Sequence, residues 1–94
     1  MVILDVYVKD DLRDGVIDLL LGCGHDNFFL IAAKKYAAKN LLVSSEEKVT
    51  GRQNYSVIRV YLRVDEAESL GALIKENFKD LKDLSLYIVG CKPL

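Results

Sequence analysis

Two stretches of the chain alternate apolar and polar side chains with the period of a β-strand. In residues 2–8 the even-numbered positions are aliphatic, and the odd-numbered ones include Asp5 and Tyr7. In residues 55–64 the even-numbered positions are aliphatic from 58 onward, while tyrosine, valine and arginine occupy the odd-numbered ones. A strand points successive side chains to opposite faces of its sheet. Both stretches therefore predict strands with one apolar face.

Two other stretches follow the helical period. The first has one apolar stripe at positions i, i+4, i+7 and i+8, formed by Leu12, Val16, Leu19 and Leu20. We expect Asp10 or Asp11 to cap the start of this helix, and Gly22 and Gly24 to end it.

The second helix is expected to begin at Asp65, where residues 65–68 have the sequence of a capping box. Its apolar stripe consists of Leu70, Leu73, Ile74 and Phe78. This spacing predicts a helix that packs one face against the rest of the domain.

Two shorter apolar runs complete the pattern. Residues 28–33 predict a buried strand, although their composition also suits a helix, and residues 84–89 predict a last strand. Residues 34–54 connect the first of these runs to the strand predicted over residues 55–64. They show no clean hydrophobic period, apart from a helical turn expected over residues 44–49 before Gly51. A connection of this length in a compact domain usually has a function or is mobile.

The elements therefore follow the order strand, helix, strand, long loop, strand, helix, strand. Two right-handed βαβ crossovers in this order build a four-stranded antiparallel sheet with both helices on one face. We predict a single α+β domain over residues 1–94 with this ferredoxin-like βαββαβ fold.

Composition narrows the class of protein. Half of the residues are hydrophobic (51%) and 29% are charged, as in a folded globular domain. Thirteen basic and fourteen acidic residues give a net charge of −1, so no nucleic-acid partner is expected. The chain starts without a leader-like pattern and has no apolar run of about 20 residues. We expect a cytoplasmic protein with reduced cysteines and no direct membrane insertion.

The sheet face without helices is the most informative predicted surface. We assign to it an interleaved set of aromatic and arginine side chains, with Tyr7, Arg59, Tyr61, Arg63 and Tyr87 as contacts between subunits. Tyrosine and arginine are common anchors of protein interfaces. RNA stacking on the tyrosines is a weaker alternative, because residues 55–64 lack the glycines of an RNA-recognition strand.

Two further groups of residues carry candidate chemistry. Cys23 and His25 form a C-x-H pair suited to a transition metal, with Cys91 as a third candidate ligand, although an accidental pair is the simpler explanation. Gly51, Arg52 and Gln53 end the long loop, where the arginine suits a phosphate or carboxylate. Lys34, Lys35 and Lys39 precede these residues on the same predicted loop. The acidic residues suggest no catalytic pair, and we expect no enzymatic activity.

The stretch Glu47-Lys48-Val49-Thr50-Gly51-Arg52-Gln53 resembles a small family of the PII-like superfamily, which also includes PII regulators and CutA proteins. The element order resembles it along nearly the whole chain, and the residues at 86–93 match its last strand in part. In PII the loop before the last strand is glycine-rich, whereas residues 79–84 contain no glycine.

The resemblance implies a regulatory homotrimer whose long loop, residues 34–54, contacts a small ligand or a partner protein such as a transporter. Lys34, Lys39, Glu47, Gly51, Arg52 and Gln53 are the implied ligand contacts. PII binds adenine nucleotides between subunits, and nucleotide binding by this chain is left open. Some relatives occur with heavy-metal efflux systems, so a small metal-binding protein using Cys23 and His25 is the alternative.

Overall fold

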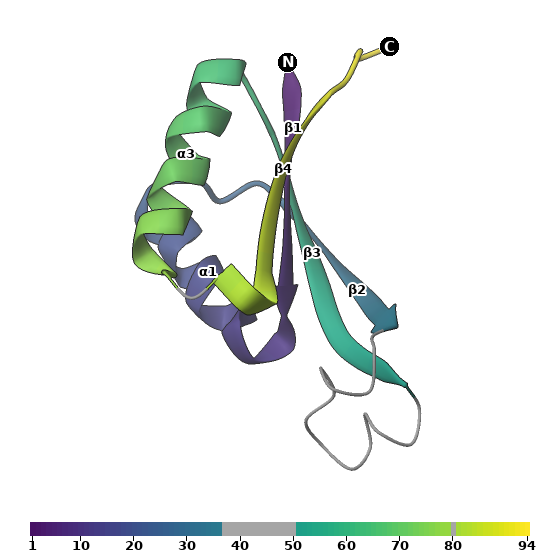
Figure 1. Ribbon diagram of the computed structural model, residues 1–94. Helices are drawn as coiled ribbons and strands as arrows, with labels where there is room; N and C mark the ends of the chain where they lie inside the picture. Colours follow the sequence, from purple (N-terminus) through teal and green to yellow (C-terminus); the bar gives the residue numbers. More distant parts are fainter. Residues whose placement is uncertain (37–50, 80) are drawn as a thin grey trace.

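The computed structural model describes residues 1–36, 51–79 and 81–94, and it confirms the predicted βαββαβ order (Figure 1). The elements are β1 (Val2–Lys9), α1 (Asp10–Gly22), β2 (Phe29–Tyr36), β3 (Arg52–Leu62), α3 (Val64–Asn77), a short 3₁₀ helix (Leu81–Asp83) and β4 (Leu84–Gly90). Within the described residues, neither helix is long and apolar enough to cross a bilayer.

The four strands form one antiparallel sheet in the order β2-β3-β1-β4. Both helices lie against the same face of this sheet, and no helix of the described residues lies over its other face (Figure 1). The register places Asp5 of β1 opposite Arg59 of β3 and Tyr87 of β4. The α+β, ferredoxin-like class expected from the sequence is therefore confirmed.

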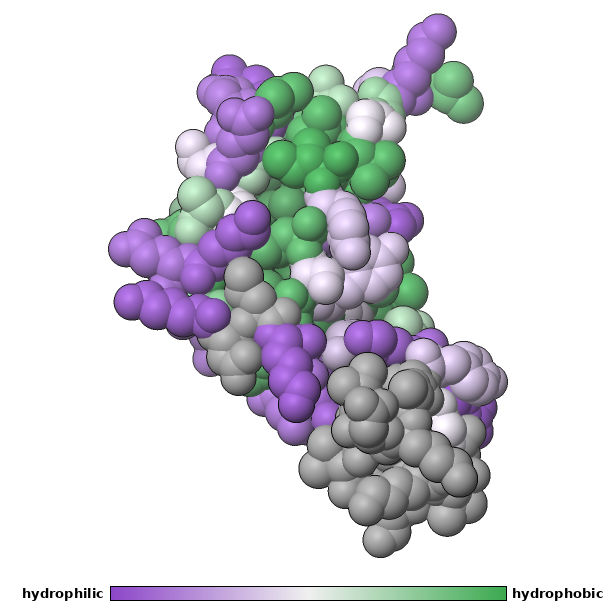
Figure 2. Space-filling model, viewed as in Figure 1, coloured by the Kyte–Doolittle hydropathy of each residue, from purple (hydrophilic) through white to green (hydrophobic). Residues whose placement is uncertain are grey.

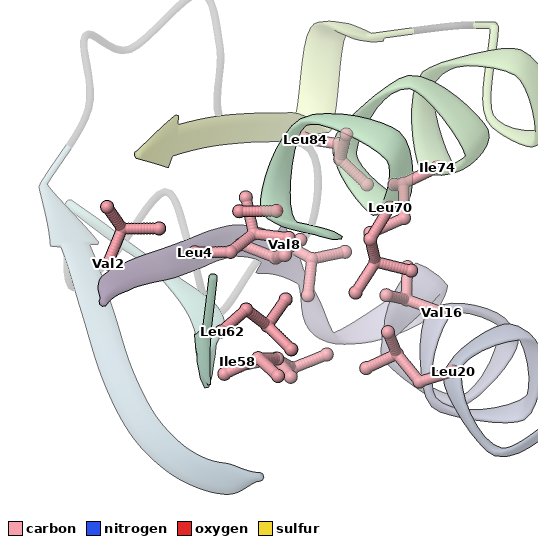
Figure 3. Packing of buried hydrophobic residues seen from close by; sticks show 13 residues of the cluster. Val2, Leu4, Val8, Val16, Leu20, Ile58, Leu62, Leu70, Ile74 and Leu84 are labelled. Atoms are coloured by element: carbon pink, nitrogen blue, oxygen red, sulfur yellow. The ribbon is translucent and has the colours of Figure 1, made fainter. Parts of the chain in front are cut away.

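The core lies between the helices and the even-numbered side chains of the central strands. Figure 3 shows strand and helix side chains that point toward one another. They are Leu4, Val8, Ile58 and Leu62 from the sheet, Val16 and Leu20 from α1, and Leu70 and Ile74 from α3. Most of these side chains are almost completely buried. Hydrophobic burial of one face explains why the period-2 pattern of β1 and β3 was readable from the sequence.

Strand β3 begins three residues earlier and ends two residues earlier than predicted. It begins at Arg52 because β2 continues to Tyr36 and pairs with it. It ends at Leu62 because Leu62 pairs with Val2, the first residue of β1. Arg63 follows as the N-cap of α3, and Val64 is already helical.

Neither helix has the side-chain cap that we expected. The N-cap residues are Lys9 and Arg63, and neither makes a side-chain cap hydrogen bond. The acidic residues instead occupy the first turns of the helices, where the helix dipole favours negative charge. Asp10 also accepts a hydrogen bond of 2.8 Å from the Ser56 hydroxyl, which links the start of α1 to β3.

Strand β2 exists as predicted but is not buried. Seven of its eight residues are exposed, because β2 is an edge strand and the described helices cover little of it. Lys34 and Lys35 belong to this strand rather than to the long loop. The helical turn expected over residues 44–49 lies outside the described residues.

Helix α1 ends as its glycines predicted, in a Schellman motif. The backbone N–H of His25 donates to the Leu20 carbonyl at 2.9 Å, and that of Gly24 donates to the Leu21 carbonyl at 3.1 Å. Gly24 has a φ of 86°, a conformation that residues with a Cβ adopt only at a cost.

This geometry predicts different effects of alanine at two neighbouring glycines. Gly24→Ala should lower the free energy of unfolding by about 1 kcal/mol, because alanine is strained at positive φ. Gly22→Ala is the matched control: Gly22 is helical and a Cβ there would meet nothing within 4 Å, so stability should be unchanged or higher. Urea unfolding of both variants measures the difference, and equal stability of the two would contradict the assignment.

Candidate functional site

The face of the sheet without helices, here called the open face, gathers the odd-numbered residues of all four strands. Its members are Ile3, Asp5, Tyr7 and Lys9 from β1, Phe29, Ile31, Ala33 and Lys35 from β2, Gln53, Tyr55, Val57, Arg59 and Tyr61 from β3, and Ser85, Tyr87 and Val89 from β4. They come to one face because the register is continuous and side chains alternate along each strand.

An ion pair lies at the centre of the open face. Arg59 donates to both carboxylate oxygens of Asp5, from Nε at 2.9 Å and from Nη2 at 3.1 Å. The Asp5 side chain is only 7% exposed and that of Arg59 is 35% exposed. The hydrogen bond to Asp5 and the charge of Asp5 raise the pKa of Arg59 above its usual value. The two opposite charges at the centre of the open face therefore compensate each other.

Two aromatic pairs flank this ion pair. Tyr7 and Tyr87 meet edge to face with ring centroids 5.6 Å apart, and Phe29 and Tyr61 do so at 6.2 Å. The first pair joins β1 to β4 and the second joins β2 to β3. Such edge-to-face pairs are a favourable arrangement of aromatic rings. They place aromatic rings on both sides of the central charges.

Much of the open face is apolar and in contact with solvent in the single chain. Six of its large hydrophobic side chains are exposed: Tyr7, Phe29, Ile31, Tyr61, Tyr87 and Val89. Figure 2, which looks onto the β4 edge of the sheet, shows hydrophobic side chains gathered along that edge. Concentrated apolar exposure of this kind marks a surface that contacts a partner or a ligand.

The structure confirms the predicted position of four of the five expected interface residues and corrects that of Arg63. Tyr7, Arg59, Tyr61 and Tyr87 lie together on the open face. Arg63 lies beyond the end of β3, where it pairs with Asp65 at 3.4 Å and Glu66 at 3.1 Å. The alternation of the sequence continues through residue 63, but the strand ends before it because β1 offers it no pairing partner.

The expected ligand contacts are divided between the two faces of the sheet. Lys34 and Arg52 lie on the side that carries the helices, whereas Gln53 lies on the open face. Lys34 donates a hydrogen bond to the side-chain oxygen of Asn54, and the Arg52 guanidinium lies 5.9 Å from the ring centre of Tyr36.

Adjacent residues of one strand point in opposite directions, so Arg52 and Gln53 do not line the same side of one site. Gly51, with a φ of 71°, turns the chain into β3. Lys39 and Glu47 lie outside the described residues.

The cysteine and histidine candidates lie elsewhere. Cys23 and His25 line a hollow between the end of α1 and the start of α3, together with Asp65 and Glu66. Within residues 1–36, 51–79 and 81–94, no group of three His, Cys, Asp or Glu side chains is placed to hold a metal ion. Cys91 is a free thiol near the carbonyl oxygen of Met1, at 3.7 Å, and does not complete a three-ligand site with Cys23 and His25.

Sequence reasoning missed two features of the open face. Phe29 was expected in a buried strand, yet it is 60% exposed and contacts Tyr61. The pairing of Asp5 with Arg59 also went unrecognised. The signal was present as opposite charges on the same predicted face, but only the strand register shows that the two residues are directly opposed.

The central ion pair predicts an asymmetric response to substitution. Arg59→Met should lower the free energy of unfolding by about 2 kcal/mol, because it leaves the buried Asp5 carboxylate without its partner. The double variant Asp5→Leu/Arg59→Met should recover most of this loss, since both charges are removed. Urea unfolding at a fixed protein concentration measures both.

Arg63→Met serves as the control for this prediction. The Arg63 side chain is 73% exposed and its ion pairs lie at the surface, so its loss should change stability by less than about 0.5 kcal/mol. If Arg59→Met and the double variant were equally destabilised, the ion pair would not have the role described.

Comparison with known proteins gives a family but no function. No match was found among the curated proteins. The model of a family described as a protein of unknown function, DUF3240, matches residues 1–90 and thus covers all the strands and helices described above. The chain belongs to the DUF3240 family of proteins of unknown function.

Proposed function

We propose that this protein is a non-enzymatic, PII-like regulatory protein of the cytoplasm that acts as a homotrimer. In this proposal the open faces of three copies pack together, and the connection between β2 and β3 contacts a small ligand or a partner protein. The observation that carries the proposal is the open face itself, with its compensated ion pair between exposed aromatic side chains.

The composition of the open face suits contact with further copies of the chain. Interface cores are depleted in charged residues and enriched in aromatic residues and arginine. The charges of Asp5 and Arg59 compensate each other within one chain, so burial of this central part of the face does not require a charged partner. The aromatic side chains around them provide anchors of the kind that dominate binding energy at interfaces.

The edge strands also favour assembly. The sequence of β4, LSLYIVG, contains no charged residue and no proline. Proteins usually protect an exposed edge strand with charges, proline, a bulge or a covering element. Contact with another copy would cover this edge.

The second part of the proposal concerns the ribbon formed by the ends of β2 and β3. Beyond the residue pair Ala33 and Tyr55, this ribbon carries the cations Lys34, Lys35 and Arg52. Residues 37–50 connect its strands and contribute two lysines and two glutamates, which add no net charge. A cationic ribbon suits an anionic ligand or an acidic surface on a partner such as a transporter.

The assembly proposal predicts a mass of about three times the 10.6 kDa of one chain in sedimentation equilibrium at micromolar concentration. Phe29→Glu and Tyr87→Glu should each shift the protein toward monomers, because each places an unpaired charge in the contact. Both side chains are more than half exposed in the single chain, so the fold itself should tolerate the changes.

Leu21→Glu is the matched control for these variants. Leu21 is a similarly exposed apolar residue, 49% exposed, but it lies on α1, and its substitution should leave the trimer intact. A wild-type protein that sediments as a monomer under these conditions would refute the trimer.

The ligand proposal predicts an effect of Arg52→Ala on nucleotide binding. Calorimetry with ATP, ADP and AMP should detect binding of at least one nucleotide, which Arg52→Ala weakens about fivefold through loss of a charge-assisted contact. Lys75→Ala, on the exposed side of α3, should leave the affinity unchanged. Absence of binding with all three would reject a nucleotide ligand and leave partner binding as the role of this segment.

A further inference from the structure

The open face is not flat but contains a hollow of about 690 Å³. Residues from all four strands line it, with Tyr7, Tyr55 and Tyr87 as its aromatic side chains and Val89 among its aliphatic ones. The charged residues of its lining are Asp5, Lys34 and Lys35. This volume lies within the range of about 300–1,000 Å³ that is typical of small-molecule sites.

Aromatic side chains form part of the wall of this hollow and contact neighbouring groups. Tyr87 is held edge to face against Tyr7, and Tyr55 is almost buried, with the ammonium of Lys35 lying 5.1 Å from its ring centre. Rings restrained in this way present preformed apolar surfaces to a ligand. A flat apolar group would contact them without ordering loose side chains.

The charges in the hollow favour a negative group on the ligand. The Asp5 carboxylate is already bound through both oxygens by Arg59, so its negative charge is compensated. Lys35 provides a cation at the wall. Lys34, whose strand position faces the other side of the sheet, also contributes to the lining, and its ammonium donates to the neutral side-chain oxygen of Asn54. Lys35, which projects from the open face beside a largely apolar lining, suits an anionic group on a ligand with an apolar body.

We propose that the hollow on the open face binds a small organic anion with a flat apolar body and one negative group near Lys35. This site is separate from the proposed contacts of Arg52, which lies on the opposite side of the sheet. It also does not depend on the trimer: in a trimer the hollow would lie between copies, and in a monomer it would open to solvent.

A matched pair of fluorescent probes tests the apolar and the ionic parts separately. 8-Anilinonaphthalene-1-sulfonate has a flat apolar body with one sulfonate, and N-phenyl-1-naphthylamine has the same body without it. The native protein should bind the sulfonate probe at one site per chain. Lys35→Gln should weaken it about fivefold and Lys35→Arg should restore it, whereas the neutral probe should change less than twofold in both variants.

Lys75→Gln on α3 is the control for a general loss of positive charge and should bind both probes as the wild type does. Urea unfolding of each variant checks that the fold is retained. The proposal would be overturned if the folded protein did not bind the sulfonate probe, or if Lys35→Gln left the affinity for this probe unchanged. If sedimentation showed a trimer that binds neither probe, copies of the chain would fill the hollow, and only the ligand site would be rejected.

Discussion

Two helices cover one face of a four-stranded sheet, and this one-sided cover is the constraint on which the other features depend. The central strands bury even-numbered side chains against α1 and α3, throughout β1 and over positions 56–62 of β3, and leave their odd-numbered ones outside the core. The core side is therefore aliphatic along β1 and from Ile58 to Leu62 of β3. The open face does not pack against the helices, so its side chains need not be aliphatic. It carries the tyrosines, the phenylalanine and the charges that distinguish this protein from a minimal α+β domain.

The ion pair between Asp5 and Arg59 makes such a surface compatible with burial. A lone carboxylate or guanidinium in the middle of an apolar surface would oppose contact with another apolar surface, because its charge would lose water without compensation. Here the two groups are joined by two hydrogen bonds within one chain. The same pairing leaves Arg59 unsuited to holding the phosphates of a nucleic acid, and it leaves Lys35 as the cation of the neighbouring hollow.

The two ends of the sheet have different properties. At the end where β1 begins and β3 ends, the chain passes directly into α3, and Arg63 pairs with the acidic first turn of that helix. At the other end β2 and β3 extend beyond β1 as a two-stranded ribbon, which lacks the support of a third strand. Arg52 lies on the opposite side of the sheet from the aromatic side chains, so its proposed anion contact and the proposed assembly use different parts of the molecule, whereas Lys35 lies on the open face and lines the hollow.

The sequence by itself determined the order of the elements, the apolar face of each central strand and the helix stripes, because burial against one layer imposes a local period of 2 or 3.6 residues. It also placed Tyr7, Arg59, Tyr61 and Tyr87 on one face. The tertiary structure alone decided the exposure of β2, the end of β3 before Arg63, the opposite orientations of Arg52 and Gln53, and the pairing of Asp5 with Arg59. These depend on strand order and register, which are set by contacts between residues distant in the chain and leave no periodic signal within any one segment.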